Sequence, residues 1–368
     1  MNNRTSPKFE TRRLLFEIAQ EGVVSLRASN GFDGDLTSQW NILVKNSSSS
    51  GFMQSLQWAQ FKKHQGYRII AIGLFLENNL VGGALGYLPE KTNGQGIICV
   101  PEGPVLDWQD EQMATKGLGL IEQAMEIEAL QAGAMALRIE PRLSPPLERC
   151  LRTFKRAPVD LLPNETLCLN LRLSEKELLA LMHHKCRYNI GLARKKNVVI
   201  REYKDASALS DFYPALIEAA QRDDFFAEPR SFFDGLCDSL CPSGMVRIFI
   251  ASHEDDILGS LLLLTYGKRA TFLYGGITNT KRQLMAGYAL QWQAIQKAKE
   301  LNCDTYDFYG YTEFDDENHD YSRFSRFKRQ FGGKMEKFIG AHDHFFLDRL
   351  ADVVIKAVNQ VEREGARR

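Results

Sequence analysis

The sequence lacks the short motifs that mark the commonest cofactor sites. It has no Walker loop, no GxGxxG stretch and no GxSxG elbow, so we expect neither ATP, nor a dinucleotide, nor a serine nucleophile. Its seven cysteines form no CxxC pair, and the adjacent His183 and His184 would point in different directions on a helix. We therefore expect no metal and no bound cofactor.

The sequence also lacks a long apolar segment and a net charge. Neither a signal peptide nor a membrane span is expected, because no apolar stretch is long enough for either. Lysine plus arginine equal aspartate plus glutamate at 46 each, so any polyanion would need a local basic patch. We predict a cytoplasmic protein with reduced thiols, and this leaves room for peripheral contact with the inner membrane face.

An internal repeat indicates two domains, and at 368 residues the chain is too long for one ordinary core. Two β-rich runs within residues 67–87 flank a hairpin signal at 77–79. The same pattern returns over 246–266, where Glu254 stands 177 residues after Glu77.

A helix that leads into a strand follows each hairpin. The pairs are expected at 117–131 with 134–140 and at 288–301 with 305–309. The sequence therefore predicts an α+β protein made of a duplicated unit. The boundary between the copies is expected near Leu162-Pro163-Asn164.

Capping signals mark two further helices. Ser55 is expected to cap a short amphipathic helix that carries Trp58 and Phe61. A capping box over 174–177 is expected to start a helix that runs to about Lys196.

The second of these helices carries two arginines on one face. Arg187, Gly191 and Arg194 recur at i, i+4 and i+7, so the glycine leaves a gap between two guanidiniums. A phosphate could lie in that gap and accept bidentate hydrogen bonds. A solvated basic face is an equally good interpretation of the same residues.

A short helix in the last part of the chain combines an apolar face with a lysine. Phe324, Phe327 and Phe331 recur at i, i+3 and i+7, and Lys328 borders this stripe. An ammonium at the edge of a dry wall could donate hydrogen bonds to an oxyanion. Taken alone, these residues favour the other interpretation, a lysine whose stem covers core phenylalanines.

Seven stretches, taken in order, resemble the FemABX family of aminoacyl-tRNA-dependent peptidyltransferases, which build peptidoglycan cross-bridges. The resemblance spans nearly the whole chain from about Val23 and rests on order and spacing, since each stretch alone is weak. The stretches are SLQWAQFKK at 55–63, VPEGPVLDW at 100–108, RIEP at 138–141, HHKCRYNIGLARKK at 183–196, FLYGG at 272–276, YDFYG at 306–310 and RFKRQFGG at 326–333.

The resemblance implies an α+β fold of two tandem GNAT-like domains, with mixed sheets flanked by helices. We expect a tail over 1–21, a first domain over 22–165 that is completed by 333–368, and a second domain over 166–332. Some family members insert a long helical arm in the second domain. The corresponding stretch is too short here, so the chain resembles the armless type.

The resemblance also implies site residues in both domains. Lys328 and Asp107 are expected to be catalytic, Lys328 by stabilising an oxyanion and Asp107 by orienting or deprotonating the acceptor amine. With the Phe-Lys pair matched, the catalytic interpretation of Lys328 is preferred. Lys62 and Arg187 are expected to grip a diphosphate. The full substrate-binding set is Lys62, Arg187, Tyr274, Phe327, Trp58 and Arg194.

The implied reaction moves an amino acid from aminoacyl-tRNA to the side-chain amine of a stem peptide in a UDP- or lipid-linked muramyl peptide. The ester on tRNA is already activated, so the enzyme must align the amine and stabilise a tetrahedral oxyanion, without metal or cofactor. The basic run at 194–196 is a candidate tRNA contact, and a solvated helix end explains it equally well.

Two other functions remain open. The first is an N-acyltransferase that uses acyl-CoA on another amine or polysaccharide precursor. GNAT enzymes hold the CoA pyrophosphate with a [QR]xxGx[GA] loop, and residues 283–288 read QLMAGY, with the glycines misplaced. The second is a non-catalytic module that binds cell-wall precursor or tRNA.

Overall fold

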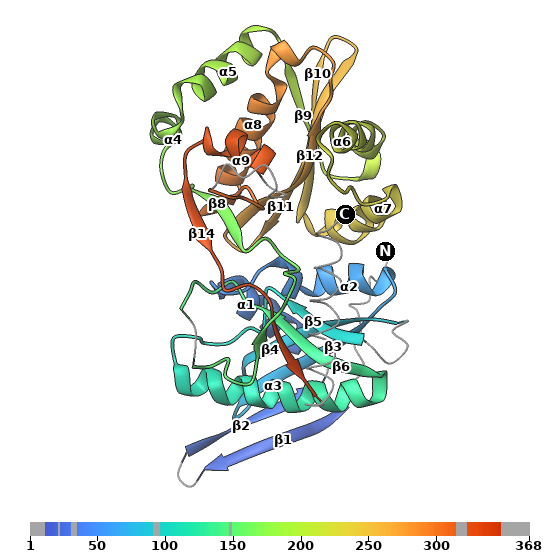
Figure 1. Cartoon of the computed structure of the whole chain (residues 1–368), viewed down its shortest axis with the longest axis vertical. Coiled ribbons are helices and arrows are strands. Elements are labelled where there is room, and N and C mark those ends of the chain that lie inside the picture. Colours follow the sequence, from blue (N-terminus) through green and yellow to red (C-terminus); the bar gives the residue numbers. More distant parts are fainter. Residues whose placement is uncertain are drawn as a thin grey trace, which may run out of the picture. The chain divides into compact units, whose positions relative to one another are not determined.

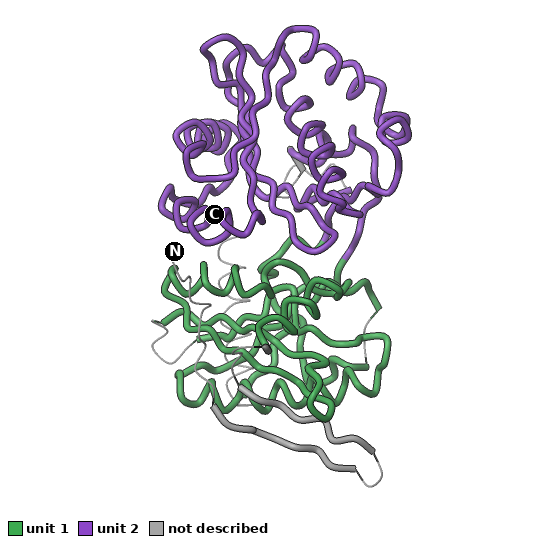
Figure 2. The backbone as a smooth tube through the Cα atoms, turned by 180° about the vertical axis from the view of Figure 1, so that it is seen from behind, with its two compact units in different colours: residues 1–164, 338–368 green, residues 165–337 purple. Residues whose placement is uncertain are grey.

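The structure divides into two units that follow the expected duplication. It is a computed structural model that describes residues 12–20, 23–30, 35–90, 96–146, 149–313 and 322–346. Unit 1 comprises residues 1–164 and 338–368, and unit 2 comprises residues 165–337 (Figure 2). Each unit is described by itself.

Unit 1 is built on an eight-stranded sheet in the order β1-β2-β3-β4-β5-β6-β15-β7. The long helix α3 lies on one face, and α1 and α2 lie on the other (Figure 1). The elements are β1 Arg12–Gln20, β2 Val23–Asn30, α1 Asp35–Asn46, η1 Phe52–Gln54, α2 Leu56–His64, β3 Tyr67–Leu76, β4 Asn79–Pro89, β5 Gly96–Pro101, α3 Glu111–Ala132, β6 Ala134–Glu140, β7 Lys155–Arg156 and β15 His342–Phe345.

Unit 2 is built on a seven-stranded sheet in the order β14-β8-β13-β12-β11-β10-β9. Helix α8 covers one face and α6 the other (Figure 1). The elements are β8 Glu165–Asn170, α4 Glu175–Leu181, α5 His184–Lys195, β9 Val199–Tyr203, η2 Ala206–Ala208, α6 Leu209–Asp223, α7 Arg230–Leu240, η3 Cys241–Ser243, β10 Val246–His253, β11 Asp256–Tyr266, β12 Arg269–Ile277, η4 Arg282–Leu284, α8 Ala286–Glu300, β13 Thr305–Asp307, α9 Ser322–Arg329 and β14 Lys334–Lys337.

The duplication predicted from the two hairpins is confirmed in backbone detail. Glu77 and Glu254, the equivalent turn residues, both adopt the left-handed conformation, with φ of 56° and 54°. The bulge between Leu74 and Phe75 is matched by a bulge between Ala251 and Ser252, again 177 residues later. The two hairpins therefore share a turn and a break in register as well as a sequence pattern.

The two units differ in where their parallel pair of strands stops being hydrogen-bonded. In unit 1 the parallel ladder of β5 and β6 extends from Gly96 to Pro101. In unit 2 the parallel ladder of β12 and β13 ends at the pair Thr271 and Asp307, although β12 runs on to Ile277. The chain after Asp307 is therefore released from β12 in unit 2 alone.

Two expectations about the chain's ends need correction. Residues 12–20 were expected in a tail but form β1, because antiparallel pairing with β2 satisfies their backbone hydrogen bonds; residues 1–11 lie outside the described residues. The segment returning to unit 1 begins at 338 instead of 333, because Lys334–Lys337 pair with β8 of unit 2.

The helix expected from the capping box to about Lys196 is broken in two. Ser174 and Glu177 form the predicted capping box of α4. Met182 is extended, and His183 then caps α5 by accepting a hydrogen bond from the Lys185 N–H. The His183 N–H donates to the Gln330 carbonyl at 2.9 Å, a long-range bond that replaces one within a continuous helix.

Candidate functional site

Lys328 is buried in unit 2 and held by two backbone carbonyls. Its side chain leaves α9, is only 7% exposed, and donates to the Tyr309 carbonyl at 2.9 Å and to the Gly310 carbonyl at 2.5 Å. The Phe272 ring of β12 lies 6.0 Å from Nζ. The Lys328 ammonium therefore does not lie in solvent. The interpretation of Lys328 as a lysine whose stem merely covers the phenylalanines does not describe this buried side chain.

Burial makes Lys328 titrate near neutrality. Desolvation lowers the pKa of the Lys328 ammonium to about 7, and the Asp307 carboxylate opposes part of that change. A lysine near its midpoint at neutral pH can hold a proton for an oxyanion or release one.

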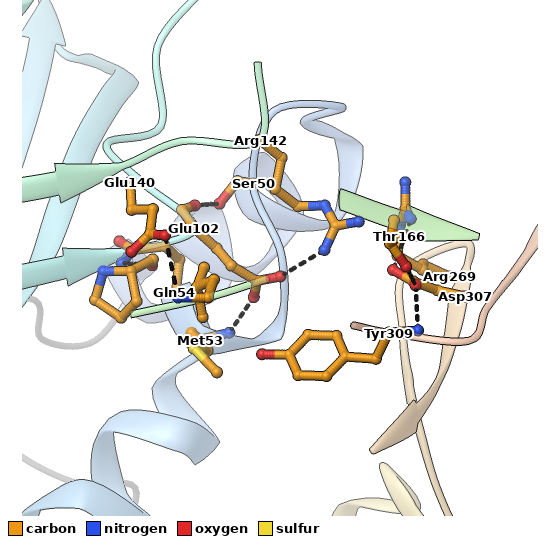
Figure 3. Close-up of polar contacts among 12 residues, drawn as sticks. Ser50, Met53, Gln54, Glu102, Glu140, Arg142, Thr166, Arg269, Asp307 and Tyr309 are labelled. Atoms are coloured by element: carbon orange, nitrogen blue, oxygen red, sulfur yellow. Dashed lines mark hydrogen bonds and ion pairs between the residues drawn. The ribbon is translucent and has the colours of Figure 1, made fainter. Parts of the chain in front are cut away.

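Asp307 holds the turn that presents those carbonyls. It is fully buried, accepts a hydrogen bond from the Thr166 hydroxyl, and pairs with Arg269 Nη1 at 2.9 Å. The Tyr309 N–H donates to Asp307 Oδ1 at 2.8 Å, and Tyr309 adopts a left-handed φ of 56°. Figure 3 shows Thr166, Arg269 and Tyr309 around this carboxylate.

The aromatic residues expected at the site lie on two faces of the sheet. Phe327 packs near Lys328 with its ring centroid 5.1 Å from Tyr288 and 5.3 Å from Phe331. Tyr274 packs instead on α7, 5.0 Å from Phe233, and burial raises its pKa. A register shift in β12 between Phe272 and Tyr274 interrupts the alternation, so Phe272 rather than Tyr274 lies with Lys328.

The two arginines expected at a phosphate site project from the exposed helix α5. Arg187 donates to the Leu179 carbonyl at 3.3 Å and to the Met182 carbonyl, so it caps the end of α4. Arg194 is exposed, and a Cβ added at Gly191 would meet nothing within 4 Å. Space is therefore open at Gly191 between Arg187 and Arg194, although Arg187 already donates two hydrogen bonds to backbone carbonyls.

The three residues expected in unit 1 lie in different environments. Trp58 is a core side chain, 7% exposed, with Phe52 and Phe61 at centroid distances of 5.0 and 5.1 Å. The Lys62 ammonium lies 3.6 Å from the centroid of the Tyr67 ring. Asp107 is exposed in the loop before α3, where its carboxylate accepts from the Gln109 N–H at 3.1 Å.

A buried polar cluster in unit 1 was not expected from the sequence. Glu102 is 1% exposed, accepts from the Met53 N–H at 2.8 Å, and pairs with Arg142 at 3.2 Å (Figure 3). Beside it, the Gln54 amide donates to the carbonyls of Leu85 and Pro101 and accepts from the Leu85 N–H. Gln54 thus bridges β4 and β5, whose own ladder is reduced to one registered pair.

Across the described ranges, no group of three or more His, Cys, Asp or Glu side chains is placed to hold a metal ion. No helix within the part of the chain that the structure describes is long and apolar enough to cross a membrane.

Comparison with solved structures defines the class of protein. The crystal structure of FemX matches with a TM-score of 0.78 and 18% identity, over 88% of this chain and 99% of that chain. A tandem GNAT protein from the clavulanic acid biosynthesis pathway matches with a TM-score of 0.51 and 12% identity, over 84% and 94%. The chain is therefore a protein of two tandem GNAT-like domains, as the sequence predicted.

Comparison with known sequences then gives the family. The model of the FemAB family matches residues 37–147 and 243–347, more than half of the chain. The chain belongs to the FemAB family. It is 23% identical to a UDP-N-acetylmuramoylpentapeptide-lysine N(6)-alanyltransferase of Weissella viridescens, over 76% of this chain and 85% of that protein. It is 21% identical to a lipid II:glycine glycyltransferase of Staphylococcus saprophyticus, over 82% and 89%.

The armless form expected from the sequence fits the structure. Residues 211–243 are all described, and they hold the rest of α6, helix α7 and the short turn η3, with no inserted helical hairpin.

Proposed function

We propose that this protein is an aminoacyltransferase that moves an amino acid from aminoacyl-tRNA to the side-chain amine of a peptidoglycan stem peptide. The observation that carries the proposal is the buried Lys328, held by two carbonyls in a member of the FemAB family. The named relatives act on UDP-N-acetylmuramoylpentapeptide and on lipid II, which supports a muramyl peptide as the acceptor.

Lys328 supplies the electrostatic part of the reaction. Attack of the amine on the aminoacyl ester forms the C–N bond and places a negative charge on the former carbonyl oxygen. The charge collapses as the C–O bond to tRNA breaks, and the tRNA oxygen leaves as a hydroxyl with the proton that the amine loses. A protonated Lys328 has three N–H donors, of which the Tyr309 and Gly310 carbonyls take two. The third N–H stabilises the oxyanion in a site of low dielectric.

The other expected residues divide between binding and packing. Asp107 is exposed, and we assign its carboxylate to the acceptor amine. Lys62 in unit 1 and Arg187 in unit 2 are separate candidates for contacts with phosphate. Phe327 lines the transfer site. Tyr274 packs on α7 and Trp58 packs in the core of unit 1, so we assign these two rings to the packing of their own units.

The exposed helix α5 is the proposed contact for tRNA in unit 2. It carries Lys185, Arg187, Arg194 and Lys195 without any carboxylate in its sequence, and Tyr188 on it is 68% exposed. A basic helix with an exposed ring suits a phosphate backbone and an unpaired base. The same charges suit peripheral contact with an anionic membrane face, so binding measurements must separate the two.

The loop that would hold CoA supports tRNA as the donor. Residues 282–284 form a 3₁₀ turn in which the N–H of Leu284 donates to Lys281 and the N–H of Met285 donates to Arg282. The amides of Leu284 and Met285 are therefore used within the turn, which removes two of the donors that a pyrophosphate-binding loop would supply.

The test is a transfer assay with purified protein, total tRNA charged with labelled amino acids, and muramyl pentapeptide in UDP-linked and lipid-linked forms. Label in one precursor identifies the amino acid and the acceptor together. If every charged tRNA is silent while acyl-CoA serves as donor, the N-acyltransferase alternative replaces the proposal. If both precursor and tRNA bind but no donor gives turnover, the protein is a binding module.

A further inference from the structure

The position of the Lys328 ammonium is set by a turn in another segment of the chain, at residues 309–310. Its two acceptors are consecutive carbonyls, Tyr309 at 2.9 Å and Gly310 at 2.5 Å, and both follow the end of β13. Consecutive carbonyls of an extended strand point in opposite directions, so one ammonium can bind both only where the backbone turns. The position of Nζ is therefore set by the conformation of residues 309–310.

That conformation is unfavourable for the residue that adopts it. Tyr309 has a φ of 56°, in the left-handed region that residues with a Cβ rarely occupy. Such a conformation persists only where the surrounding structure fixes it. The nearest fixing contact is the Tyr309 N–H, which donates to Asp307 Oδ1 at 2.8 Å.

Asp307 is itself fixed by side chains from two other strands, β8 and β12. Thr166 of β8 donates its hydroxyl to Oδ1, and Arg269 of β12 donates to Oδ2 at 2.9 Å. The Arg269 guanidinium also pairs with Glu336 of β14 at 3.3 Å. These contacts close around a carboxylate that has no exposed surface.

We infer that Asp307 is a positioning residue for the transfer reaction, one that fixes the left-handed turn at Tyr309 and thereby aims the two carbonyls that hold the Lys328 ammonium. The inference rests on the proposed function, since it gives Lys328 the role of oxyanion donor. Asp307 does not touch substrate. It acts through the turn, and its negative charge favours the protonated form of Lys328.

Three charged groups on neighbouring strands are linked in a chain of ion pairs beside Lys328. Asp307 ends β13 and pairs with Arg269 at the start of β12, and Arg269 also pairs with Glu336 on β14. Asp307 is the group whose field raises the Lys328 pKa against the effect of burial. Removing its charge while keeping its shape should therefore lower the pKa of Lys328 further.

The first experiment compares Asp307→Asn with Asp307→Ala. The amide oxygen of Asp307→Asn can still accept from the Tyr309 N–H, while its NH2 group faces Arg269, so this variant keeps the bond to the turn and loses both the charge and the pair with Arg269. Asp307→Ala loses all three. We expect kcat to fall by about tenfold to a hundredfold in Asp307→Ala, with a KM for charged tRNA within about twofold of the wild type. The kcat of Asp307→Asn should lie between those of the wild type and Asp307→Ala, and its pH–rate profile should be shifted to lower pH.

Asp304→Asn is the matched control. Asp304 lies three residues earlier, and its carboxylate pairs with Arg172 at 2.8 Å on the exposed side of the unit. An exposed ion pair contributes little to the fold. Its loss should leave kcat, KM and the pH profile unchanged.

A second pair of variants tests the turn without touching Asp307. Tyr309→Gly keeps the left-handed conformation at no steric cost, whereas Tyr309→Val opposes it. We expect Tyr309→Gly to retain more of kcat than Tyr309→Val. Equal rates in the two folded variants would contradict a role for the turn.

An NMR titration of the lysine side chains separates this inference from the proposed function, because it needs no turnover. The Lys328 resonance should titrate near 7 in the wild type and at lower pH in Asp307→Asn, with thermal unfolding confirming that each variant is folded. A Lys328 titration that is unchanged in both Asp307→Asn and Asp307→Ala would overturn the inference, even if transfer is observed. A wild type without transfer but with the shifted titration would instead count against the proposed reaction.

Discussion

The backbone N–H of His183 donates to the Gln330 carbonyl at 2.9 Å and so joins the first turn of α5 to the chain just beyond α9. Gln330 stands two residues after Lys328. Within unit 2, the exposed basic helix is therefore anchored directly to the segment that carries the buried lysine. If tRNA binds along α5 as we propose, its contact would begin beside the end of α9.

The α5 surface gives the first prediction. The double variant Arg194→Glu/Lys195→Glu should weaken tRNA binding and reduce the slope of log affinity against log salt by about 0.7 to 0.9 per lost cation. Arg152→Glu/Lys155→Glu, at exposed positions of unit 1, is the control with the same change of charge. Both variants should be titrated with uncharged tRNA and with vesicles of phosphatidylglycerol. Loss of vesicle binding with tRNA binding intact would assign α5 to a membrane surface.

The second prediction concerns the rate of transfer. Lys328→Met removes the oxyanion donor without adding a polar group, so kcat should fall by about a hundredfold to a thousandfold with binding of both substrates retained. Single-turnover measurements on the folded variant check this directly. A wild-type rate would remove Lys328 from the mechanism.

The pH dependence of transfer follows from the same residue. The oxyanion donor must be protonated, so the rate should fall as pH rises through about 7, the pKa that burial gives Lys328. Lys328→Arg keeps a charged donor at all accessible pH values, so it should be slower and lack that alkaline limb. A rate that instead rises through pH 7 in the wild type alone would identify Lys328 as a general base.

Lys328 also links stability to pH. The unfolded lysine titrates at 10.5 and the folded one near 7, so the unfolded state binds more protons between these values. The free energy of unfolding should therefore rise with pH above 7, by a few kcal/mol at most across the window. Denaturant melts at pH 7, 8 and 9 check this, with Lys328→Met as the reference that lacks the rise.

Glu140 in unit 1 should make the free energy of unfolding fall as pH rises, over a lower pH range than Lys328. Burial raises the pKa of its carboxyl from 4.5 to about 7, although the N–H groups of Leu161 and Leu162 donate to it and oppose the change. Between these values the folded state binds more protons, so stability should fall as pH rises from 4.5 to 7. Glu140→Gln should abolish that slope, which denaturant melts of the two proteins would reveal.

Gln54 offers a test of the fold of unit 1. Its buried amide satisfies the Leu85 N–H and the carbonyls of Leu85 and Pro101. Gln54→Leu should leave these groups without a partner and cost about 1 to 3 kcal/mol for each group that water cannot reach. Gln60→Leu, at a partly exposed position of α2, is the control and should cost much less.

The elements that local patterns specify were predictable. The hairpins, the capping box at Ser174 and the strand Ala134–Glu140 depend on turn residues, caps and alternation within a few positions. The break at Met182 was not predictable, because its cause is a hydrogen bond to Gln330. Residue spacing carries no information about a partner that far along the chain.

The candidate site was predictable in part for the same reason. Lys328 stood out as a cation in an apolar stretch, and the structure buries it. Asp307 lay inside a matched stretch, but its importance depends on Thr166, 141 positions away, and on Arg269, 38 positions away. The pattern around Trp58 fits a substrate contact and a core residue equally well, and only packing shows that it is enclosed.

The early end of the ladder between β12 and β13, at Asp307, is a difference between the two copies of the repeat. Duplication produces two identical units, but the turn that holds Lys328 exists only where a strand has left its neighbour at Asp307. In unit 1 the equivalent ladder stays closed to Pro101. A turn like the one at residues 309–310 would therefore need a change of strand pairing in unit 1, so the two copies differ in backbone hydrogen bonding as well as in side chains.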